Sequence, residues 1–308
     1  MSAKLANNAA LTLGARLEPV GLLWVKWLPA GLLTTLALVS GPVLPAWVWM
    51  WTIALALFLS AKWLTVFRFL CSDQSFDRRR LAAYLFLWPG MNVRAFCAKR
   101  AVPAPKTREW LFAGAKVLFG GVLVWVGVRH IAREYLLAAG WTGMIGLILL
   151  LHFGLFHLLS LVWRGWSIDA KPNMRWPATA TSLSDFWSNR WNTAFSDLMH
   201  ENVFKALARN VGAVRAVLAV FLVSGLLHEL VIALPARSGY GLPTLYFATQ
   251  YLGVSVERSG FGRRIGLGRG LIGWCFVALI TGASAFWLFP PNFVHNVILP
   301  MLHAIGAT

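Results

Sequence analysis

The chain has 308 residues, of which 58% are hydrophobic and 13% are charged. A water-soluble domain carries about 25% charged residues, so this composition excludes an ordinary soluble globular protein. The formal charge is +17, but the basic residues lie mostly between apolar runs, which favours a role in membrane orientation over nucleic-acid binding. The three cysteines form no CxxC pair, so neither a disulfide framework nor a thiolate metal site is predicted.

Apolar runs recur from residue 20 to the end of the chain, and a bilayer core needs about 20 apolar residues per helix. They predict an all-α, polytopic transmembrane protein with about eight membrane segments. The six long runs are 20–40, 46–70, 110–128, 136–163, 212–234 and 270–289. Two shorter runs, 242–256 and 293–307, are expected to be tilted, re-entrant or packed against neighbouring helices. Because no soluble stretch interrupts the pattern, we expect a single membrane domain over residues 1–308.

The segments between these runs differ sharply in positive charge. Residues 71–109, 164–210 and 257–269 hold eight, six and four Lys or Arg, whereas the intervening turns hold two at most, such as Arg129 and Arg133. By the positive-inside rule the three basic loops and both termini lie on the cytoplasmic side. The compact size and the lack of targeting signals favour a bacterial inner membrane, with an internal eukaryotic membrane as the alternative.

Two segments of these basic loops are too apolar or too regular to be simple linkers. YLFLWPGMN at residues 84–92 is expected to lie in the membrane interface or to dip into the bilayer. Ser182 and Asp185 fit a capping box, so residues 181–207 predict a helix that begins near Ser184. At helical spacing this helix has two faces. The apolar face comprises Trp187, Trp191, Ala194, Phe195 and Leu198. The polar face comprises Asp185, Asn189, Asn192, Ser196 and His200. Either the polar face meets water at the membrane surface, or it borders a reaction chamber.

The run at 212–234 places His228 and Glu229 next to each other in an apolar helix. Ionisable groups within a membrane are costly and usually face a cavity or a partner. Neighbouring helical residues point ~100° apart, so one of the two can line a cavity while the other pairs with another helix. Ser224 and Gly225 lie one turn below, and their small side chains leave room beside the imidazole. A histidine that only hydrogen-bonds to another span is the structural alternative.

Several other patterns carry no predicted chemistry. HELVI lacks the second histidine of the zinc motif HExxH, which excludes a metalloprotease. A GxGxxG pattern occurs at 268–273, but no strand precedes it and no acidic residue follows, so a dinucleotide site is not predicted. Three further histidines have no role that the pattern fixes: His152, His157 and His200.

Three motifs resemble the membrane-bound O-acyltransferase family, in particular its wax-synthase-like branch. They are WPGMN at 88–92, SLSDFWSNRWN at 182–192 and FLVSGLLHELV at 221–231, in the order and rough spacing of that branch and within residues 84–260. The resemblance implies an acyltransferase fold of tilted helices in which His228 and Asn192 define the active site. It also implies acyl-CoA as a co-substrate that enters from the cytoplasm, and a lipophilic hydroxyl acceptor that enters from the lipid side.

The chemistry of these residues fits that expectation. A neutral imidazole at His228 can accept the proton of a hydroxyl that attacks a thioester, and Asn192 can hydrogen-bond the thioester oxygen or orient the acceptor. Because a thiolate leaves readily, no metal, cofactor or covalent nucleophile is expected. Basic loops can attract the phosphates of CoA, although membrane orientation explains the same charges. Contacts to the substrates are expected from Trp187, Arg190, Trp191, Ser224 and Glu229.

The expected reaction is transfer of a fatty acyl group to a long-chain alcohol, which is wax ester synthesis, with sterols and glycerolipids as alternative acceptors. A transporter or flippase that uses His228 and Glu229 as a proton relay is the alternative from another functional class. Transporters often contain internal repeats, and neither the RWN nor the HE segment is repeated in this chain.

Overall fold

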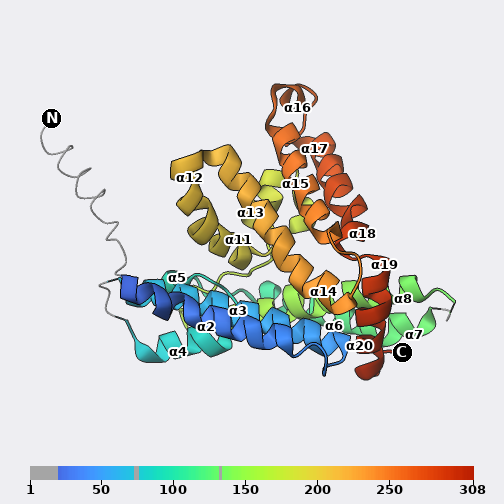
Figure 1. The fold of residues 1–308 in the computed structure, drawn as a ribbon, viewed down its shortest axis with the longest axis horizontal. Coiled ribbons are helices and arrows are strands. Elements are labelled where there is room, and N and C mark those ends of the chain that lie inside the picture. The colour runs from blue at the N-terminus through green and yellow to red at the C-terminus, as the bar shows by residue number, and fades with distance from the viewer. Residues whose placement is uncertain (1–19, 73–75, 132–133) are drawn as a thin grey trace, which may run out of the picture.

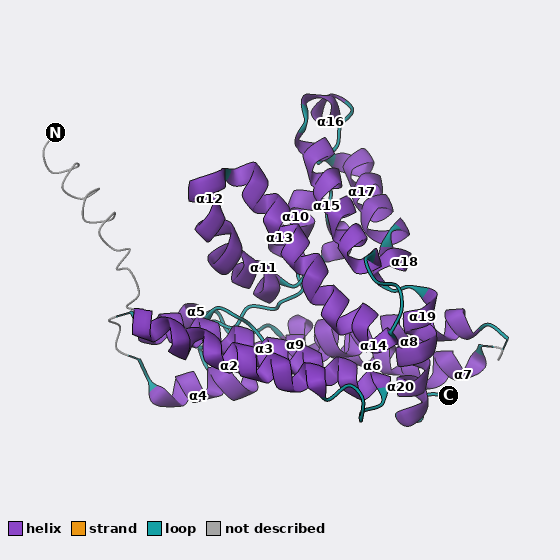
Figure 2. Cartoon of the chain, viewed as in Figure 1, coloured by secondary structure: helices purple, strands orange, loops and turns teal. Residues whose placement is uncertain are grey.

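The computed structural model describes residues 20–72, 76–131 and 134–308, and all regular secondary structure within these ranges is helical. The predicted all-α class is therefore confirmed (Figures 1 and 2). The expectations for residues 1–19 and Arg133 fall outside the described ranges.

In the labels used here, α marks an α-helix and η a short π-helical or 3-10 segment that in most cases continues the helix before it. The first half of the described chain forms α2 (Val20–Val39), α3 (Ala46–Leu70), α4 (Arg78–Leu87), α5 (Val93–Cys97), α6 (Thr107–Val122), η1 (Leu123–Gly127), α7 (Val128–His130), α8 (Leu136–Ile148), η2 (Leu149–Leu155) and α9 (Phe156–Gly165). The middle forms η3 (Pro177–Thr179), α10 (Leu183–Asp185), η4 (Phe186–Arg190), α11 (Thr193–Met199), η5 (His200–Phe204), α12 (Lys205–Val211), α13 (Ala213–His228), η6 (Glu229–Ala233) and α14 (Leu234–Ala236). The last part forms α15 (Leu242–Arg258), α16 (Gly260–Arg264), α17 (Gly270–Ala278), η7 (Leu279–Ala283), α18 (Ala285–Leu288), α19 (Pro291–Phe293), η8 (Val294–Ile298) and α20 (Leu299–Ala304).

Five helical runs of the described chain are long and apolar enough to cross a membrane: Ala46–Leu70, Thr107–His130, Leu136–Gly165, Ala213–Ala236 and Gly270–Leu288. Each coincides with one of the long runs predicted from the sequence. The other three predicted segments are also helical, but α2 contributes a shorter apolar stretch, α15 has 17 residues, and the last segment is divided among α19, η8 and α20. The polytopic character is thus borne out, and the count of eight segments stays a prediction.

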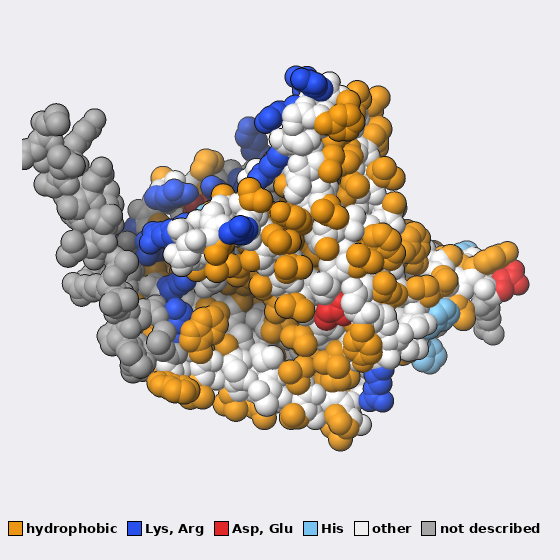
Figure 3. Space-filling view, turned by 45° about the horizontal axis from the view of Figure 1, so that its top comes forward, with side chains coloured by type: hydrophobic (Ala, Val, Ile, Leu, Met, Phe, Trp, Pro, Cys, Tyr) orange, Lys and Arg blue, Asp and Glu red, His pale blue; other side chains and the backbone are white. Residues whose placement is uncertain are grey.

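The helices lie in two groups. In Figure 1, α2 and α3 run side by side along the lower edge, and α13, α15 and α17 stand above them. Within the upper group α13 and α15 pack closely. Gly225 makes this approach possible, since a Cβ added there would lie only 2.8 Å from the Cα of Thr244. Apolar side chains cover much of the face seen in Figure 3, as a lipid-facing surface requires, while Lys and Arg gather on one side of it and near α16.

Residues 84–92 lie against α3. Their first part ends helix α4, and Lys62 of α3 donates hydrogen bonds to the backbone oxygens of Tyr84 (3.0 Å) and Gly90 (2.6 Å). The ammonium nitrogen also lies 3.4 Å from the centre of the Tyr84 ring, a cation–π contact. A buried lysine thereby attaches the WPGMN loop to a membrane-spanning helix, and the expected depth of this loop in the bilayer stays a prediction.

The prediction of one continuous helix from Ser184 onward is wrong. Ser182 caps α10 as expected, since its Oγ accepts a hydrogen bond from the backbone N–H of Asp185 (3.3 Å). The helix is interrupted at Asn192, whose backbone is left-handed (φ 42°, ψ 61°) and whose Oδ1 accepts from the N–H of Phe195 (3.3 Å) to start α11. Asparagine tolerates the left-handed region and caps helices well, so it is suited to a break of this kind. As a result, the two predicted faces are not continuous stripes.

Candidate active site

A cavity of about 1090 Å³, here called the chamber, lies among η4, α11, α13, α15 and the run from α17 to α18. Its lining is largely apolar and aromatic, and its size suits a lipid-sized ligand. The interruption at Asn192 lets residues from both predicted faces of the 181–207 segment reach it, including Phe195 and His200. Five of the seven predicted site residues line it: Trp187, Trp191, Asn192, Ser224 and His228.

His228 lies at the end of α13 with its ring against the ring of Phe247 (centroids 4.6 Å apart) and near that of Phe195 (6.5 Å). Its Nδ1 lies 2.7 Å from the carbonyl oxygen of Ser224, one turn below. A carbonyl oxygen only accepts, so Nδ1 carries the proton of a neutral imidazole and Nε2 keeps a free electron pair. This contact sets the tautomer in which Nε2 can act as a base.

Glu229 points away from the chamber, as the ~100° step between neighbouring helical residues allows. Its carboxylate accepts hydrogen bonds from the N–H groups of Gly241 (3.1 Å) and Thr244 (2.9 Å) and from the Thr244 hydroxyl (2.8 Å). It therefore satisfies free backbone N–H groups at the beginning of α15, where negative charge is also favourable. Glu229 does not line the chamber, and its expected contact with a substrate stays a prediction. Gly225 likewise serves the close approach to Thr244 and is not among the residues that line the chamber.

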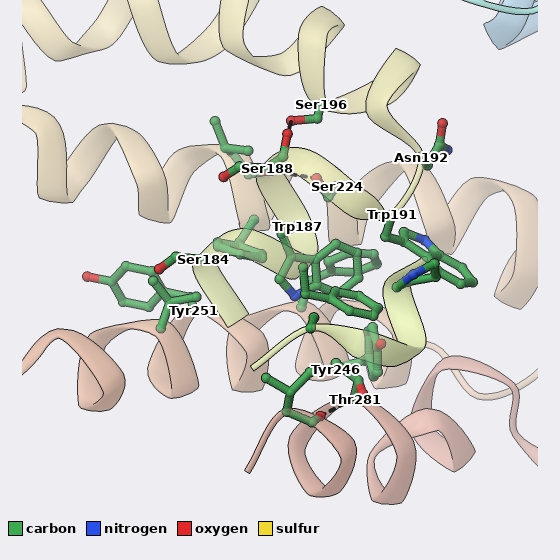
Figure 4. Close-up of a pocket in the computed structure, with 18 of the residues that line it drawn as sticks. Ser184, Trp187, Ser188, Trp191, Asn192, Ser196, Ser224, Tyr246, Tyr251 and Thr281 are labelled. Carbon is green, nitrogen blue, oxygen red and sulfur yellow. Dashed lines mark hydrogen bonds between the residues drawn. The ribbon is translucent and has the colours of Figure 1, made fainter. Parts of the chain in front are cut away.

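Asn192 joins η4 to α11 at the edge of the chamber. Its Oδ1 is used by the helix cap, and no described residue accepts a hydrogen bond from its Nδ2. Figure 4 shows its side chain directed away from the indole rings of Trp187 and Trp191. Within the described chain no hydrogen bond joins Asn192 to His228, so a substrate would have to lie between these two groups for both to act on it.

The two tryptophans form the aromatic wall of the chamber. Trp187 lies between the rings of Phe221 (6.1 Å) and Phe247 (5.7 Å), and Trp191 is stacked on Phe186 with an interplanar angle of 11°. The buried indole N–H of Trp187 has no hydrogen-bond partner among the described residues. A buried donor of this kind costs about 1–3 kcal/mol unless an acceptor reaches it, which makes it a candidate contact for a substrate oxygen.

Arg190 does not line the chamber. It forms an ion pair with Asp185 and donates to the Thr179 hydroxyl (2.6 Å) and the Trp176 carbonyl (3.1 Å), which holds η3 against η4. Burial raises the pKa of Asp185, but the hydrogen bonds from Arg190 and Asn189 outweigh that effect and keep the pKa below its usual value. Arg190 thus forms a structural ion pair outside the chamber lining, and its expected contact with a substrate stays a prediction.

Sequence reasoning missed Glu257, a buried carboxylate near the end of α15. It accepts from the hydroxyls of Ser182 (2.9 Å) and Ser184 (2.9 Å) and from the N–H groups of Leu183 (2.5 Å) and Ser184 (3.2 Å). These bonds fix the beginning of the α10–η4 helix, which carries Trp187 and is followed directly by Trp191. The sequence did contain a signal for this role of Glu257. It is an acidic residue directly after the apolar run 242–256, and Arg258 follows it.

The other histidines have varied surroundings. His157 pairs with Lys116 (2.8 Å), which agrees with an ordinary interhelical hydrogen bond, and His152 packs on Phe156 with no partner for its Nδ1 among the described residues. His200 lines the chamber and is stacked on Phe204. In the part of the chain that the structure describes, no three His, Cys, Asp or Glu side chains converge as metal ligands.

Residues 170–249 match the model of the membrane bound O-acyl transferase family. This range contains the interrupted helix around Asn192, all of α13 and the beginning of α15, so it covers most of the chamber wall.

Relatives with curated names each match less than half of the chain. The probable long-chain-alcohol O-fatty-acyltransferase 7 of Arabidopsis thaliana is 29% identical over 42% of this chain and 41% of its own length. The long-chain-alcohol O-fatty-acyltransferase of Simmondsia chinensis is 32% identical over 42% of this chain and 40% of its own length. The acyl-CoA–sterol O-acyltransferase 1 of Arabidopsis thaliana is 34% identical over 46% of this chain and 45% of its own length. The chain thus spans less than half the length of these relatives. Over residues 170–249 it is similar to the membrane-bound O-acyltransferase family, and the relatives named above are long-chain-alcohol or sterol O-acyltransferases.

Proposed function

We propose that the protein transfers a fatty acyl group from acyl-CoA to the hydroxyl of a lipophilic acceptor, with a long-chain alcohol as the preferred acceptor. The observation that carries the proposal is the hydrogen bond from His228 Nδ1 to the Ser224 carbonyl (2.7 Å), which leaves Nε2 as a base on the chamber wall. The names of the relatives support the substrate classes, since they act on long-chain alcohols or a sterol.

In the proposed reaction, Nε2 of His228 accepts the proton of the acceptor hydroxyl as its oxygen attacks the thioester carbonyl. The tetrahedral intermediate then breaks its C–S bond, and the imidazolium returns the proton to the CoA thiolate. Asn192 Nδ2, which has no acceptor among the described residues, donates to the developing oxyanion. The reaction balances with acyl-CoA and alcohol alone, so we propose no cofactor or metal. The apolar lining keeps water from competing with the alcohol.

We propose that one membrane domain extends over residues 1–308 and that the three basic loops face the cytoplasm, where acyl-CoA is available. A bacterial inner membrane stays a prediction, because the relatives named above come from plants. The transporter alternative gains no support from Glu229, since three hydrogen bonds at the beginning of α15 already engage its carboxylate.

The test is ester formation by purified protein in nanodiscs, with labelled palmitoyl-CoA and a panel of long-chain alcohols, a sterol and diacylglycerol. His228→Ala and His228→Gln are expected to lose activity by roughly 100- to 10,000-fold, the usual contribution of a general base. His130→Ala is the matched control, because His130 is exposed and bonds only to its own helix, at Val126. Full activity in a folded His228→Ala protein would refute the mechanism. If the wild-type protein forms no ester with any acceptor, the reaction itself is refuted.

A further inference from the structure

One end of the chamber differs from the rest in carrying a basic side chain. Arg258, the last residue of α15, is the only Lys or Arg among the described residues that line the chamber, and its side chain is exposed. Its Nε donates to the hydroxyl of Ser184 (3.0 Å), and no described residue accepts from its two terminal nitrogens. The hydroxyl-bearing side chains of Ser255 and Ser259 line the same end.

The distance from this end to the catalytic histidine follows from the geometry of α15. Phe247, which contacts the His228 ring, and Arg258 both belong to this uninterrupted helix. At a rise of 1.5 Å per residue, the eleven steps between them span about 16 Å along the helix axis. Figure 4 agrees with a long chamber, since Ser184 and Tyr251 lie on one side of it and Trp191 on the other, with Trp187 between them.

We infer that Arg258 binds the diphosphate of the acyl-CoA donor, and this inference rests on the proposed function. Thirteen bonds separate the thioester sulfur of CoA from the nearer phosphorus. An extended chain advances about 1.2 Å per bond, so the pantetheine arm spans about 15 Å. A thioester beside His228 therefore places the diphosphate beside Arg258. The guanidinium offers two free N–H-bearing nitrogens there, an arrangement suited to bidentate phosphate binding.

The anchoring of Arg258 supports this role. Its neighbour Glu257 is buried and bonded to the beginning of α10, and Ser184 donates to Glu257 while it accepts from Arg258. The guanidinium is therefore oriented before a ligand arrives, which reduces the entropy lost on binding. Among the described residues Arg258 forms no ion pair, and the hydrogen bonds of Glu257 go to residues of the α10 segment.

A second hollow, of about 590 Å³, is richer in positive charge but does not fit the same role. Its basic residues are Arg94, Arg100, Lys171 and Arg175. It lies on the opposite face of α11, lined by Ala194 and Asp197, whereas Phe195 and Ser196 line the chamber, and no described residue lines both. The buried Asp169 also pairs with Arg100. A thioester in the chamber would have its CoA arm separated from this hollow by α11.

The inference is tested by comparing palmitoyl-CoA with S-palmitoyl-pantetheine, a donor that lacks the phosphates. Equilibrium binding of both labelled donors to the full-length protein in nanodiscs is measured beside the kinetics of ester formation. Arg258→Gln is expected to weaken binding of palmitoyl-CoA roughly 10- to 100-fold, and to raise its KM with little change in kcat, while leaving S-palmitoyl-pantetheine unchanged. Arg258→Lys keeps part of the preference for palmitoyl-CoA. Arg263→Gln and Arg264→Gln, which remove the same charge from neighbouring α16 outside the chamber, are the controls and change neither donor.

Three results would overturn the inference: equal losses with both donors, no loss with either, or a wild-type protein that binds the two donors equally. The same holds if Arg94→Gln or Arg175→Gln, in the second hollow, abolishes the preference while Arg258→Gln does not. A different result refutes the proposed function alone: palmitoyl-CoA binds through Arg258, but no acceptor is esterified.

Discussion

Asn192 combines two roles that substitutions can separate. Its left-handed backbone and its Oδ1 cap maintain the junction between η4 and α11, whereas its Nδ2 is the proposed oxyanion donor. Asn192→Asp keeps a side-chain oxygen for the cap and tolerates the same backbone conformation, but it lacks the N–H group. We expect this variant to stay folded and to lose roughly 100- to 1,000-fold in kcat, the usual effect of losing one oxyanion donor.

Asn192→Gly and Asn192→Ala complete the comparison. Glycine adopts φ of 42° without strain but removes the cap, and alanine removes the cap and is also strained there, so we expect Ala to be the less stable. Loss of a cap costs about 0.5–2 kcal/mol, and the left-handed backbone adds about 1–2 kcal/mol for alanine. Thermal unfolding in detergent measures the stability order. Asn192→Asp with full activity would remove Nδ2 from the mechanism.

At this scale the sequence identified the histidine, the asparagine and the two tryptophans of the chamber from ionisable groups in an apolar helix and from family motifs. It did not show that Arg190 and Glu229 lie outside the chamber lining, because the pattern considers each helix by itself. Their partners, Asp185 beside Arg190 and the backbone of Thr244 beside Glu229, are known only once the chain is folded. The direction in which a polar side chain points depends on which polar groups of the neighbouring elements still lack a hydrogen-bond partner.

Among the elements, α10 and η4 depend on a single carboxylate from α15. Glu257→Ala leaves the N–H groups of Leu183 and Ser184 without their acceptor in a buried place. Each unsatisfied group costs about 1–3 kcal/mol, so we expect a markedly lower melting temperature and a displaced aromatic wall. Glu201→Gln is the control, because the exposed pair of Glu201 with Lys205 contributes about 0.5 kcal/mol or less. Equal melting temperatures for the two variants would contradict the role assigned to Glu257.

The contact between α13 and α15 gives a second prediction at this scale. Gly225→Ala places a methyl group 2.8 Å from the Cα of Thr244, so the helices must separate, at a cost of about 1–3 kcal/mol. Gly114→Ala in α6 is the matched control, since a Cβ there meets nothing within 4 Å and alanine favours the helix by about 0.5–1 kcal/mol. Thermal unfolding should therefore shift in opposite directions for the two variants. A stabilised Gly225→Ala protein would show that the helices are not held at this spacing.

Helix positions were largely predictable from hydrophobic runs, because twenty apolar residues have few other stable arrangements in a bilayer. The interruption of the 181–207 segment was not predictable in the same way. Helical periodicity continues through Asn192, and the break depends on one residue that adopts a left-handed backbone and caps the next helix. Such a residue is equally compatible with a helix interior when only the pattern is considered.

For the whole molecule, charge asymmetry predicts which side each loop faces. Lys171 lies in the loop after α9 and is exposed, and Tyr240 is exposed in the turn between α14 and α15, at the other end of the Ala213–Ala236 span. We expect a cysteine at residue 171 to react with a membrane-impermeant maleimide only from the cytoplasmic side, and one at residue 240 only from the opposite side.

The background for this labelling is Cys71→Ser with Cys275→Ser, which removes the two exposed thiols. Burial raises the pKa of the remaining Cys97 to about 11, so at pH 7.5 its thiol stays protonated and unreactive. Intact cells and inverted vesicles provide the two accessible sides. Reaction of both introduced cysteines from the same side would refute the predicted orientation.

The attachment of α15 at both ends also bears on how long an acyl chain the protein accepts. Glu229 holds its beginning and Glu257 holds the segment beside its end, so this wall cannot retreat to admit a longer chain. The run from α17 to α18, which packs beside α15, lines the chamber with the small residues Ala278, Gly282 and Ala285, and a Cβ at Gly282 would meet nothing within 4 Å. Gly282→Leu should therefore shift donor preference from palmitoyl-CoA towards lauroyl-CoA, as measured with a series from octanoyl- to stearoyl-CoA. An unchanged donor preference would mean that other residues determine the acyl chain length that the protein accepts. Because α15 is fixed, the space beside Ala278, Gly282 and Ala285 then sets the length of acyl chain that fits in the chamber.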